Sequence, residues 1–478
     1  MSWIGLALLP FVGAMLVLTG LPAFLVLIGA AGLGAIAAAT GGDGALLTAL
    51  PGRLVGLLEN DLLQALPLFV FIGALLNRLP LAETLFRTGL RLTRGTPAGP
   101  SIVALGLGAL LAPMNGSVAA SVTMLSRAVY PRLLRHGVEP VEGLATVAVA
   151  STLGVVVPPS LVLILLGDAM MGAHTIASNA MGRSERIINT QDIFRGVLGS
   201  AILFVALCVI ATTWIRRRGK PVSAKASRTD LIVSILSCCF IVGILGGVAA
   251  GLFYAVEAAA LGATVLLLSG LLVRRLDGAA LAKVLAETLA LTGALFALLL
   301  AATTFTLVLR SLGTDHLLSR LIADLPGGEL GATLVVLAIL AASAFVLDAF
   351  EIIFVVVPIV MPGLLMRTSD AVWVSVLAIL TLQASFLLPP LGYAVMMARS
   401  AMADPVRTWP LMRALVPYLA VHALVVAVTV AVPGLVHLGA SPQSAPTDPS
   451  VSNEQVEQQL QRLIPDITPD LSLPNISD

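Results

Sequence analysis

Long apolar segments, separated by short polar or charged stretches, make up most of this chain. Segments 4–18, 62–76, 231–253 and 332–347 approach or exceed the ~20 residues that a helix needs to cross a bilayer. The pattern predicts an all-α polytopic membrane protein with about ten to twelve spanning elements. Segment 3–18 has neither a basic leader nor an Ala-x-Ala cleavage site, so we expect a retained helix rather than a signal peptide.

The interruptions of these segments repeat at an offset of 231 residues. Shifted by that amount, Pro158-Pro159 falls on Pro389-Pro390 and Ser117 falls on Asp348. Each half therefore has one apolar segment broken by a polar group and a second broken by two prolines. Interrupted segments at matching positions of two halves are typical of the binding site of a secondary transporter.

Four regions follow from this pattern. Residues 1–215 form a first membrane repeat, 216–228 a basic linker, 229–438 a second membrane repeat, and 439–478 a polar, acidic tail. The positive-inside rule places the basic linker in the cytoplasm. The tail is rich in Pro, Ser, Asn and Gln, a composition that predicts a flexible segment outside the membrane.

Composition supports the membrane assignment and excludes several function classes. The chain is 58% hydrophobic and 11% charged, against about 25% charged in soluble domains. Its net charge of +1 gives no support to a nucleic-acid partner. No HExxH, Walker A or GxSxG sequence occurs, which argues against zinc chemistry, ATP-driven transport by this chain alone and serine hydrolysis.

The double prolines predict free carbonyl groups inside the membrane. In a helix, Pro158 and Pro159 free the carbonyls of Gly154 and Val155, because proline lacks a backbone N–H. Pro389-Pro390 free those of Ser385 and Phe386 in the same way. Such oxygens suit a small hard cation. The alternative is that each proline pair only kinks its helix and binds no ligand. Two proline pairs at matching positions of the two halves favour a cation site instead.

Polar side chains stand at both helix breaks. Asn115-Gly116-Ser117 offers amide and hydroxyl oxygens in the first half, and Asp348 offers a carboxylate at the equivalent place in the second. An ionisable group within the membrane costs at least about 2.5 kcal/mol, so Asp348 is a functional candidate. It could instead cap a half-helix, and the two roles are compatible. Glu351, one turn later, is a weaker candidate.

These motifs resemble the large membrane (permease) subunit of tripartite ATP-independent periplasmic (TRAP) transporters, over residues 1–438. The strongest matches are 151–160 (STLGVVVPPS), 347–351 (LDAFE) and 381–390 (TLQASFLLPP). The forms of 348–351 and 382–383 are similar to the branch labelled mannitol/chloroaromatic-type. Leu388 departs from the pattern, because relatives often have threonine before the second proline pair.

The resemblance implies two inverted-topology repeats with re-entrant hairpins and broken helices, working as an elevator-type transporter in the bacterial inner membrane. It implies co-transported sodium ions, no organic cofactor, and an organic anion such as a carboxylate as substrate. The implied partners are a periplasmic substrate-binding protein and a small four-helix membrane subunit, which we expect to be a separate chain.

Site residues follow from the resemblance and from the freed carbonyls together. The first sodium set contains Asn115, Gly116, Ser117, Thr152, Gly154 and Val155. The second contains Asp348, Gln383, Ser385 and Phe386. The candidate substrate contacts are Ser117, Ser160 and Asp348.

Two other functions remain open at this point. One is a stand-alone sodium/anion elevator symporter that works without a binding protein. The other is an intramembrane enzyme, which the lack of a catalytic pair within the apolar segments disfavours.

Overall fold

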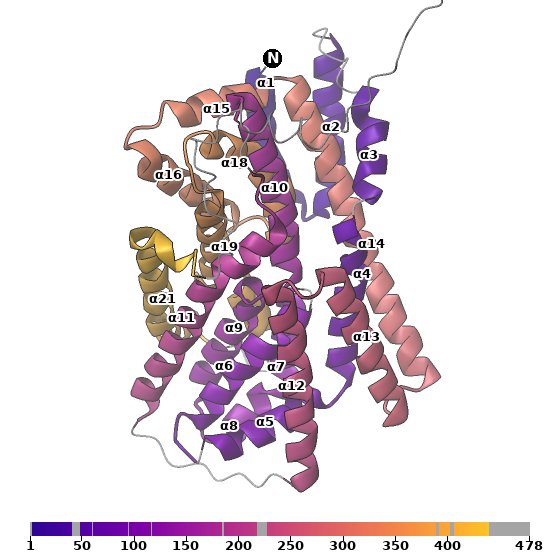
Figure 1. Cartoon of the computed structure of the whole chain (residues 1–478), viewed down its shortest axis with the longest axis vertical. Helices are drawn as coiled ribbons and strands as arrows, with labels where there is room; N and C mark the ends of the chain where they lie inside the picture. Colours follow the sequence, from indigo (N-terminus) through magenta and orange to yellow (C-terminus); the bar gives the residue numbers. More distant parts are fainter. Residues whose placement is uncertain are drawn as a thin grey trace, which may run out of the picture. The chain divides into compact units, whose positions relative to one another are not determined.

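The structure, a computed structural model, describes residues 2–40, 48–59, 61–93, 95–115, 117–183, 186–217, 227–388, 392–401 and 406–438. Within these ranges the chain forms helices and no strands (Figure 1). The helices are α1 Ser2–Thr19, α2 Ala23–Thr40, α3 Leu50–Leu58, α4 Asp61–Arg78, α5 Leu81–Leu92, α6 Gly99–Leu111, η2 Pro113–Asn115, α7 Val118–Ala128, α8 Tyr130–Arg135, α9 Pro140–Val156, α10 Leu161–Met181, α11 Thr190–Arg216, α12 Arg228–Ala250, α13 Ala255–Leu272, α14 Gly278–Ser311, α15 Thr314–Ala323, α16 Gly328–Ser343, α17 Ala349–Glu351, η3 Ile352–Val356, α18 Val357–Leu365, α19 Ala371–Leu387, α20 Tyr393–Ser400, α21 Thr408–Ala431 and η4 Pro433–Leu435.

Eight helices of the described chain are long and apolar enough to cross a membrane: α1, α2, α10, α11, α12, α13, α14 and α21. The bent pair α3 and α4 adds a ninth span if counted as one. This is fewer than the ten to twelve spans expected from hydropathy. The difference arises because α6, α9, α16 and α19 have only 13 to 17 residues and end at breaks.

Local sequence explains where the long helices begin and end. Asn189 and Asp192 form a reciprocal capping box at the start of α11, and Ser227 and Asp230 form one at the start of α12. The C-terminus of α12 is closed by Gly251, whose φ of 79° is one that side-chain-bearing residues rarely adopt. These residues set where α11 and α12, the two spans on either side of the linker, begin, and where α12 ends.

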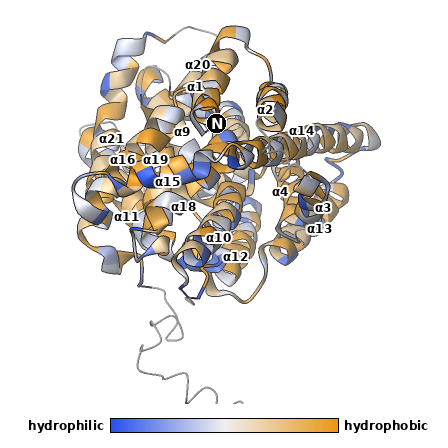
Figure 2. Ribbon diagram, turned by 90° about the horizontal axis from the view of Figure 1, so that it is seen from above, coloured by the Kyte–Doolittle hydropathy of each residue, from blue (hydrophilic) through white to orange (hydrophobic). Residues whose placement is uncertain are grey.

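Apolar burial distinguishes the inner helices from the outer ones. Every residue of α9 from Gly143 to Val156 is buried, so this helix is enclosed on all sides. In contrast, α1, α12 and α13 keep large apolar side chains exposed, such as Leu18, Leu236 and Leu272. Figure 2 shows apolar residues along most of the length of the helices. The outer helices therefore present the surface that a lipid bilayer covers.

Basic residues gather at one end of the membrane part. Arg132 of α8 pairs with Glu83 of α5 at 2.6 Å, and its hydrogen bond holds the pKa of Glu83 below its usual value. At the end of α11, Arg216 pairs with Glu142 at 3.0 Å and donates to the carbonyls of Pro97 and Gly137. These ion pairs and hydrogen bonds join α5, α8, α9 and α11 at this end. The basic linker follows α11 and precedes α12 at the same end (Figure 1).

The two halves share boundaries as well as motifs. Helix α9, shifted by 231 residues, falls on α19, and the first residue of α7 falls on the first residue of α17. Across the halves, α19 packs against α9, α20 packs against α7 and α9, and α18 packs against α10. The duplicated elements thus form one interlocked unit rather than two separate lobes.

Candidate functional site

The first break is the tip of a helical hairpin formed by α6 and α7. Pro113 begins one short turn, η2, and Ser117 then starts α7 by accepting a hydrogen bond from the N–H of Ala120 at 3.1 Å. Asn115 is 1% exposed, and its amide nitrogen donates to the hydroxyl of Ser121 at 3.3 Å. Its side-chain oxygen is buried and has no hydrogen-bond donor among the described atoms. This oxygen is available to a ligand.

The second break separates α9 from α10. Helix α9 ends at Val156, and Val157 turns into an extended conformation (φ −86°, ψ 116°) before Pro158 and Pro159, which are joined by a cis peptide bond. Ser160 starts α10 by accepting from the N–H of Leu163 at 3.2 Å. No described N–H donates to the carbonyls of Gly154 and Val155.

Glycine brings these two breaks into direct contact. A Cβ atom on Gly154 would lie 2.6 Å from the carbonyl oxygen of Ala112, which ends α6. On the other side of the tip, a Cβ atom on Gly73 of α4 would lie 2.6 Å from the carbonyl oxygen of Asn115. The hairpin tip therefore sits between α4 and the end of α9, at a distance that only glycine permits.

The third break repeats the hairpin in the second half. Helix α16 ends at Ser343, and Asp348 starts α17 with a carboxylate oxygen that accepts from the N–H of Ala349 at 2.7 Å. Glu351 completes a capping box by accepting from the N–H of Asp348 at 3.0 Å. The Asp348 carboxylate also accepts from the backbone N–H of Glu351, so this side chain caps the start of α17.

The fourth break ends α19. Leu388 leaves the helix in an extended conformation (φ −73°, ψ 112°), and α20 begins at Tyr393. The carbonyl of Ser385, which proline spacing predicted to be free, accepts from the N–H of Leu388 at 3.3 Å. Leu388 still has its N–H and tightens the last turn. No described N–H donates to the carbonyl of Phe386.

Gln383, one turn before this break, is fully buried. Its exposure is 0%, and neither its amide nitrogen nor its amide oxygen has a hydrogen-bond partner in the described part of the chain. An amide buried without partners costs about 1–3 kcal/mol. Such a group is unusual in a packed helix, where buried polar side chains normally have partners.

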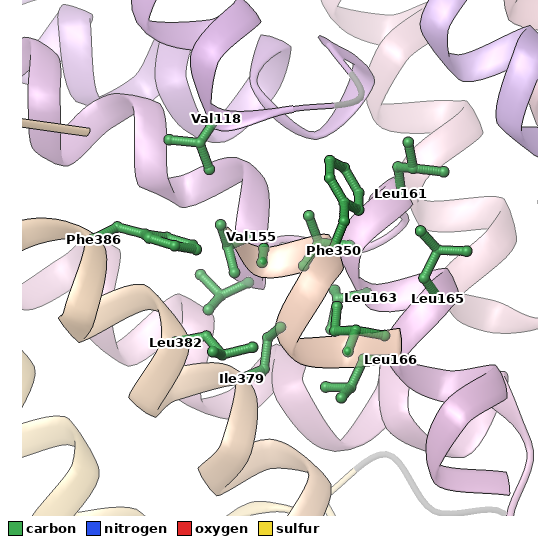
Figure 3. Packing of buried hydrophobic residues seen from close by; sticks show 14 of the residues in the cluster. Val118, Val155, Leu161, Leu163, Leu165, Leu166, Phe350, Ile379, Leu382 and Phe386 are labelled. Atoms are coloured by element: carbon green, nitrogen blue, oxygen red, sulfur yellow. The ribbon is translucent and has the colours of Figure 1, made fainter. Parts of the chain in front are cut away.

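The four breaks lie within one apolar core. Figure 3 shows Val118, Val155, Leu161, Phe350 and Phe386, each within a turn of a break, packed together in this core. Contacts between α17 and α10, and between α20 and α7, connect the breaks of one half to those of the other. The interruptions, widely separated in sequence, thus meet in one region of the fold.

The structure gives most candidate residues a definite local role. Ser117 and Ser160 use their hydroxyl oxygens as N-caps, while the hydroxyls of Thr152 and Ser385 donate to carbonyls of their own helices. A hydroxyl that donates in this way keeps acceptor lone pairs for a cation. Gly116 and Pro389-Pro390 lie outside the described residues.

Two features of the region escaped the sequence reasoning. Tyr393, the first residue of α20, lies close to the carboxyl groups of Asp348 and Glu351, so the second hairpin tip and the second broken helix are neighbours. Residues Ile352–Val356 form a π-helical segment directly after α17, a distortion that is frequent at functional sites. Neither feature has a sequence pattern of its own, because both depend on the packing of α17 against its neighbours.

The described residues contain no cluster of three or more His, Cys, Asp or Glu side chains able to hold a metal ion. The available ligands at the breaks are instead neutral carbonyl and amide oxygens with one carboxylate. This donor set fits a weakly bound monovalent cation better than a zinc or iron centre.

Comparison with known proteins gives similar chains throughout the membrane part. The C4-dicarboxylate TRAP transporter large permease protein DctM of Rhodobacter capsulatus is 21% identical over 390 residues, covering 79% of this chain and 88% of that protein. The sialic acid TRAP transporter large permease protein SiaM of Vibrio cholerae is 24% identical, covering 80% and 86%. The ectoine TRAP transporter large permease protein TeaC of Halomonas elongata is 22% identical, covering 76% and 83%.

A solved structure shows the same fold. The crystal structure of the Alcanivorax borkumensis YdaH transporter, described as having an unusual topology, superposes with a TM-score of 0.61. It is 16% identical and covers 82% of this chain and 89% of that one. The family model for the DctM component of tripartite ATP-independent periplasmic transporters matches residues 10–435. This chain therefore belongs to the DctM family of TRAP transporter large permeases, which are multi-pass proteins of the bacterial inner membrane and transporters rather than enzymes.

Proposed function

We propose that this chain is the large permease subunit of a sodium-coupled transporter that imports an organic anion, of the carboxylate kind, from a periplasmic binding protein. Relatives named for C4-dicarboxylates and for sialic acid support a carboxylate substrate. The relative named for ectoine shows that the family's substrates vary. We therefore expect the binding protein that delivers the substrate to determine which anion is transported.

The observation that carries this proposal is the meeting of four helix breaks within the buried core. Near these breaks lie the free carbonyls of Gly154 and Val155, the unpaired oxygen of Asn115, and the unpaired amide of Gln383. A protein has little reason to bury such groups in an apolar core unless a ligand compensates them. Sodium ions at the breaks would do so, with Asp348 adding a negative charge.

The same breaks support an elevator mechanism. The hairpins α6–α7 and α16–α18 and the broken helices α9–α10 and α19–α20 pack on one another and would move as a unit carrying the site. Substrate would bind beside the ions near Ser117, Ser160 and Asp348, where helix N-termini point toward an anion. A small four-helix membrane subunit would complete the membrane part.

Uptake into proteoliposomes tests the proposal. The chain is reconstituted with its small subunit and binding protein, and uptake of the binding protein's ligand is measured with and without an inward sodium gradient. We expect uptake only with the gradient and all three proteins. Asp348→Asn keeps a cap, because asparagine caps as well as aspartate, but it removes the charge. It should reduce sodium-dependent uptake at least tenfold.

Asp277→Asn is the matched control. Asp277 is also an N-cap, accepting from the N–H of Ala280 at 2.7 Å at the exposed start of α14. Its substitution should leave uptake unchanged. Full uptake by Asp348→Asn would remove this carboxylate from the ion site. Uptake by this chain alone would instead favour a stand-alone sodium/anion symporter.

A further inference from the structure

A second site lies away from the helix breaks, in a cavity of about 420 Å³ between the N-terminal halves of α9 and α21 and the C-terminal end of α11. None of the residues assigned above to sodium or to substrate lines it. Its volume falls within the range of small-molecule pockets, about 300–1,000 Å³. The cavity is therefore large enough for a ligand that the transport mechanism does not account for.

The rim of this cavity carries one unpaired charge of each sign. Arg413 is exposed, and its guanidinium lies 5.2 Å from the centre of the Trp409 ring. Within the described chain no carboxylate pairs with it. Glu139 is also exposed, and its side chain makes no capping bond at the start of α9. The other charges of the lining, Arg216 and Glu142, already pair with each other at 3.0 Å.

The inner wall of the cavity is lined by hydroxyl groups. Thr212 of α11 lies 3.1 Å from the hydroxyl of Tyr418 on α21, oxygen to oxygen, and both residues are buried. Thr146 of α9 lines the same wall, and its hydroxyl donates to the carbonyl of Glu142 at 2.8 Å. The hydroxyl protons of this wall are already used, because Thr212 donates to the carbonyl of Cys208 and Thr146 to that of Glu142. The groups left for a ligand are therefore the two charges of the rim, which favour a zwitterionic ligand.

The cavity lies at the level of a membrane surface. Trp409 is 60% exposed and Trp214, near the end of α11, is 67% exposed, with the guanidinium of Arg217 lying 5.6 Å from its ring. Exposed tryptophan beside arginine is typical of the interface between lipid and water. Further along the same helices, Ile210 and Val416 are exposed and apolar. A lipid with its headgroup in the cavity would find apolar surface for its acyl chains.

We propose that this cavity binds the phosphoethanolamine headgroup of a phospholipid, with the phosphate at Arg413 and the ammonium at Glu139. The proposal is independent of the transport function. The primary ammonium donates N–H hydrogen bonds to the Glu139 carboxylate, which the methylated ammonium of choline cannot do. A phosphatidylglycerol headgroup has no cation for Glu139. The cavity should therefore prefer phosphatidylethanolamine to both other lipids.

Native mass spectrometry of the full-length protein, delipidated in detergent, tests this preference. Phosphatidylethanolamine, phosphatidylcholine and phosphatidylglycerol with identical acyl chains are added separately, and bound lipid is counted. We expect phosphatidylethanolamine to be retained about tenfold more tightly, the effect of one charge-assisted hydrogen bond. Arg413→Gln and Glu139→Gln should each remove this preference.

Two matched variants control for general effects of charge. Arg217→Gln removes an arginine that stacks on tryptophan but does not line the cavity, and Glu329→Gln removes an exposed acid from the first turn of α16. Both should keep the preference. All variants are checked for unchanged thermal unfolding, so a loss of lipid reflects the site.

Three outcomes would contradict the proposal. Equal retention of the three lipids by the wild-type chain would show that no headgroup is selected. A preference that survives both Arg413→Gln and Glu139→Gln would place the lipid elsewhere. If free phosphoethanolamine bound as tightly as the lipid, the occupant would be a soluble phosphate ester, and the lipid assignment would be wrong.

Discussion

At the scale of single residues, the unusual side chains of this protein are its buried amides. Gln383 has two polar atoms in the core without partners, and Asn115 has one. Buried polar side chains in native proteins are usually hydrogen-bonded. By contrast, the nearby hydroxyl of Ser385 donates to the carbonyl of Thr381 at 2.8 Å. Stability alone therefore does not explain why amides, rather than apolar residues, occupy these positions.

The substitution Gln383→Leu should separate stability from transport. Leucine has a similar volume and no polar atoms, so it removes the cost of the unpaired amide, about 1–3 kcal/mol. We expect thermal unfolding in sodium-free detergent to occur at an equal or higher temperature than in the wild type. Sodium-dependent uptake should be lost, because a cation ligand is gone. Both quantities are measured on the same preparation.

Ser375→Ala provides the control on the same helix. Ser375 is fully buried, but its hydroxyl donates to the carbonyl of Ala371 at 2.7 Å, one turn earlier. Its loss should reduce stability slightly and leave uptake intact. If Gln383→Leu transported normally, the amide would have no role in ion binding.

At the scale of elements, the site depends on close approach between α6 and α9. A Cβ atom on Gly108 would lie 2.3 Å from the carbonyl oxygen of Ala150, and one on Gly154 would lie 2.6 Å from that of Ala112. One glycine on each helix thus allows the two backbones to come into contact at two positions along their length. Small residues at such crossings are common where membrane helices pack. This contact fixes the first hairpin against the first broken helix.

Two glycines of α6 offer a direct comparison. Gly106→Ala meets no atom within 4 Å and should stabilise the protein by roughly 0.5–1 kcal/mol, because alanine favours helix. Gly108→Ala forces α6 away from α9 and should destabilise it by about 1–3 kcal/mol. Thermal unfolding of the two variants measures the difference. Similar effects of both substitutions would mean that the helices separate more easily than their geometry indicates.

At the scale of the whole molecule, the membrane part is self-contained. One core cluster extends from Leu8 on α1 to Val436 after η4. Residues 1–439 form one compact unit by internal contacts, and residues 440–478 are assigned to another. The proposed ion site, the lipid cavity and the linker flanks all lie within the first unit.

Removal of residues 440–478 should therefore leave the membrane part intact. We expect a chain that ends at 439 to insert, to unfold at the temperature of the full-length protein, and to transport at the full rate with its partners. Size-exclusion profiles, thermal unfolding and uptake measure these three properties. A truncated chain that aggregated or lost uptake would show that the tail contributes to folding or to partner contact.

Much of the architecture was predictable from the sequence. Apolar length predicted α1 and α12, and the double proline predicted the end of α9. Proline acts on its own backbone, so its effect can be read locally. The resemblance to TRAP permeases is confirmed by the family match over residues 10–435. The number of full spans was overestimated, because hydropathy does not distinguish a crossing helix from one arm of a hairpin.

The positions of the helix breaks can be read from the sequence, because proline, glycine and capping residues act within one turn of the chain. Which of these breaks come together depends on how distant segments pack. The contact of Gly154 with Ala112 and the approach of Tyr393 to Asp348 depend on packing between distant segments. The lipid cavity likewise exists only because Arg413 and Glu139 come to one opening from α21 and α9. Burial, which gives these groups their energetic significance, is a property of the packed fold and not of the local sequence.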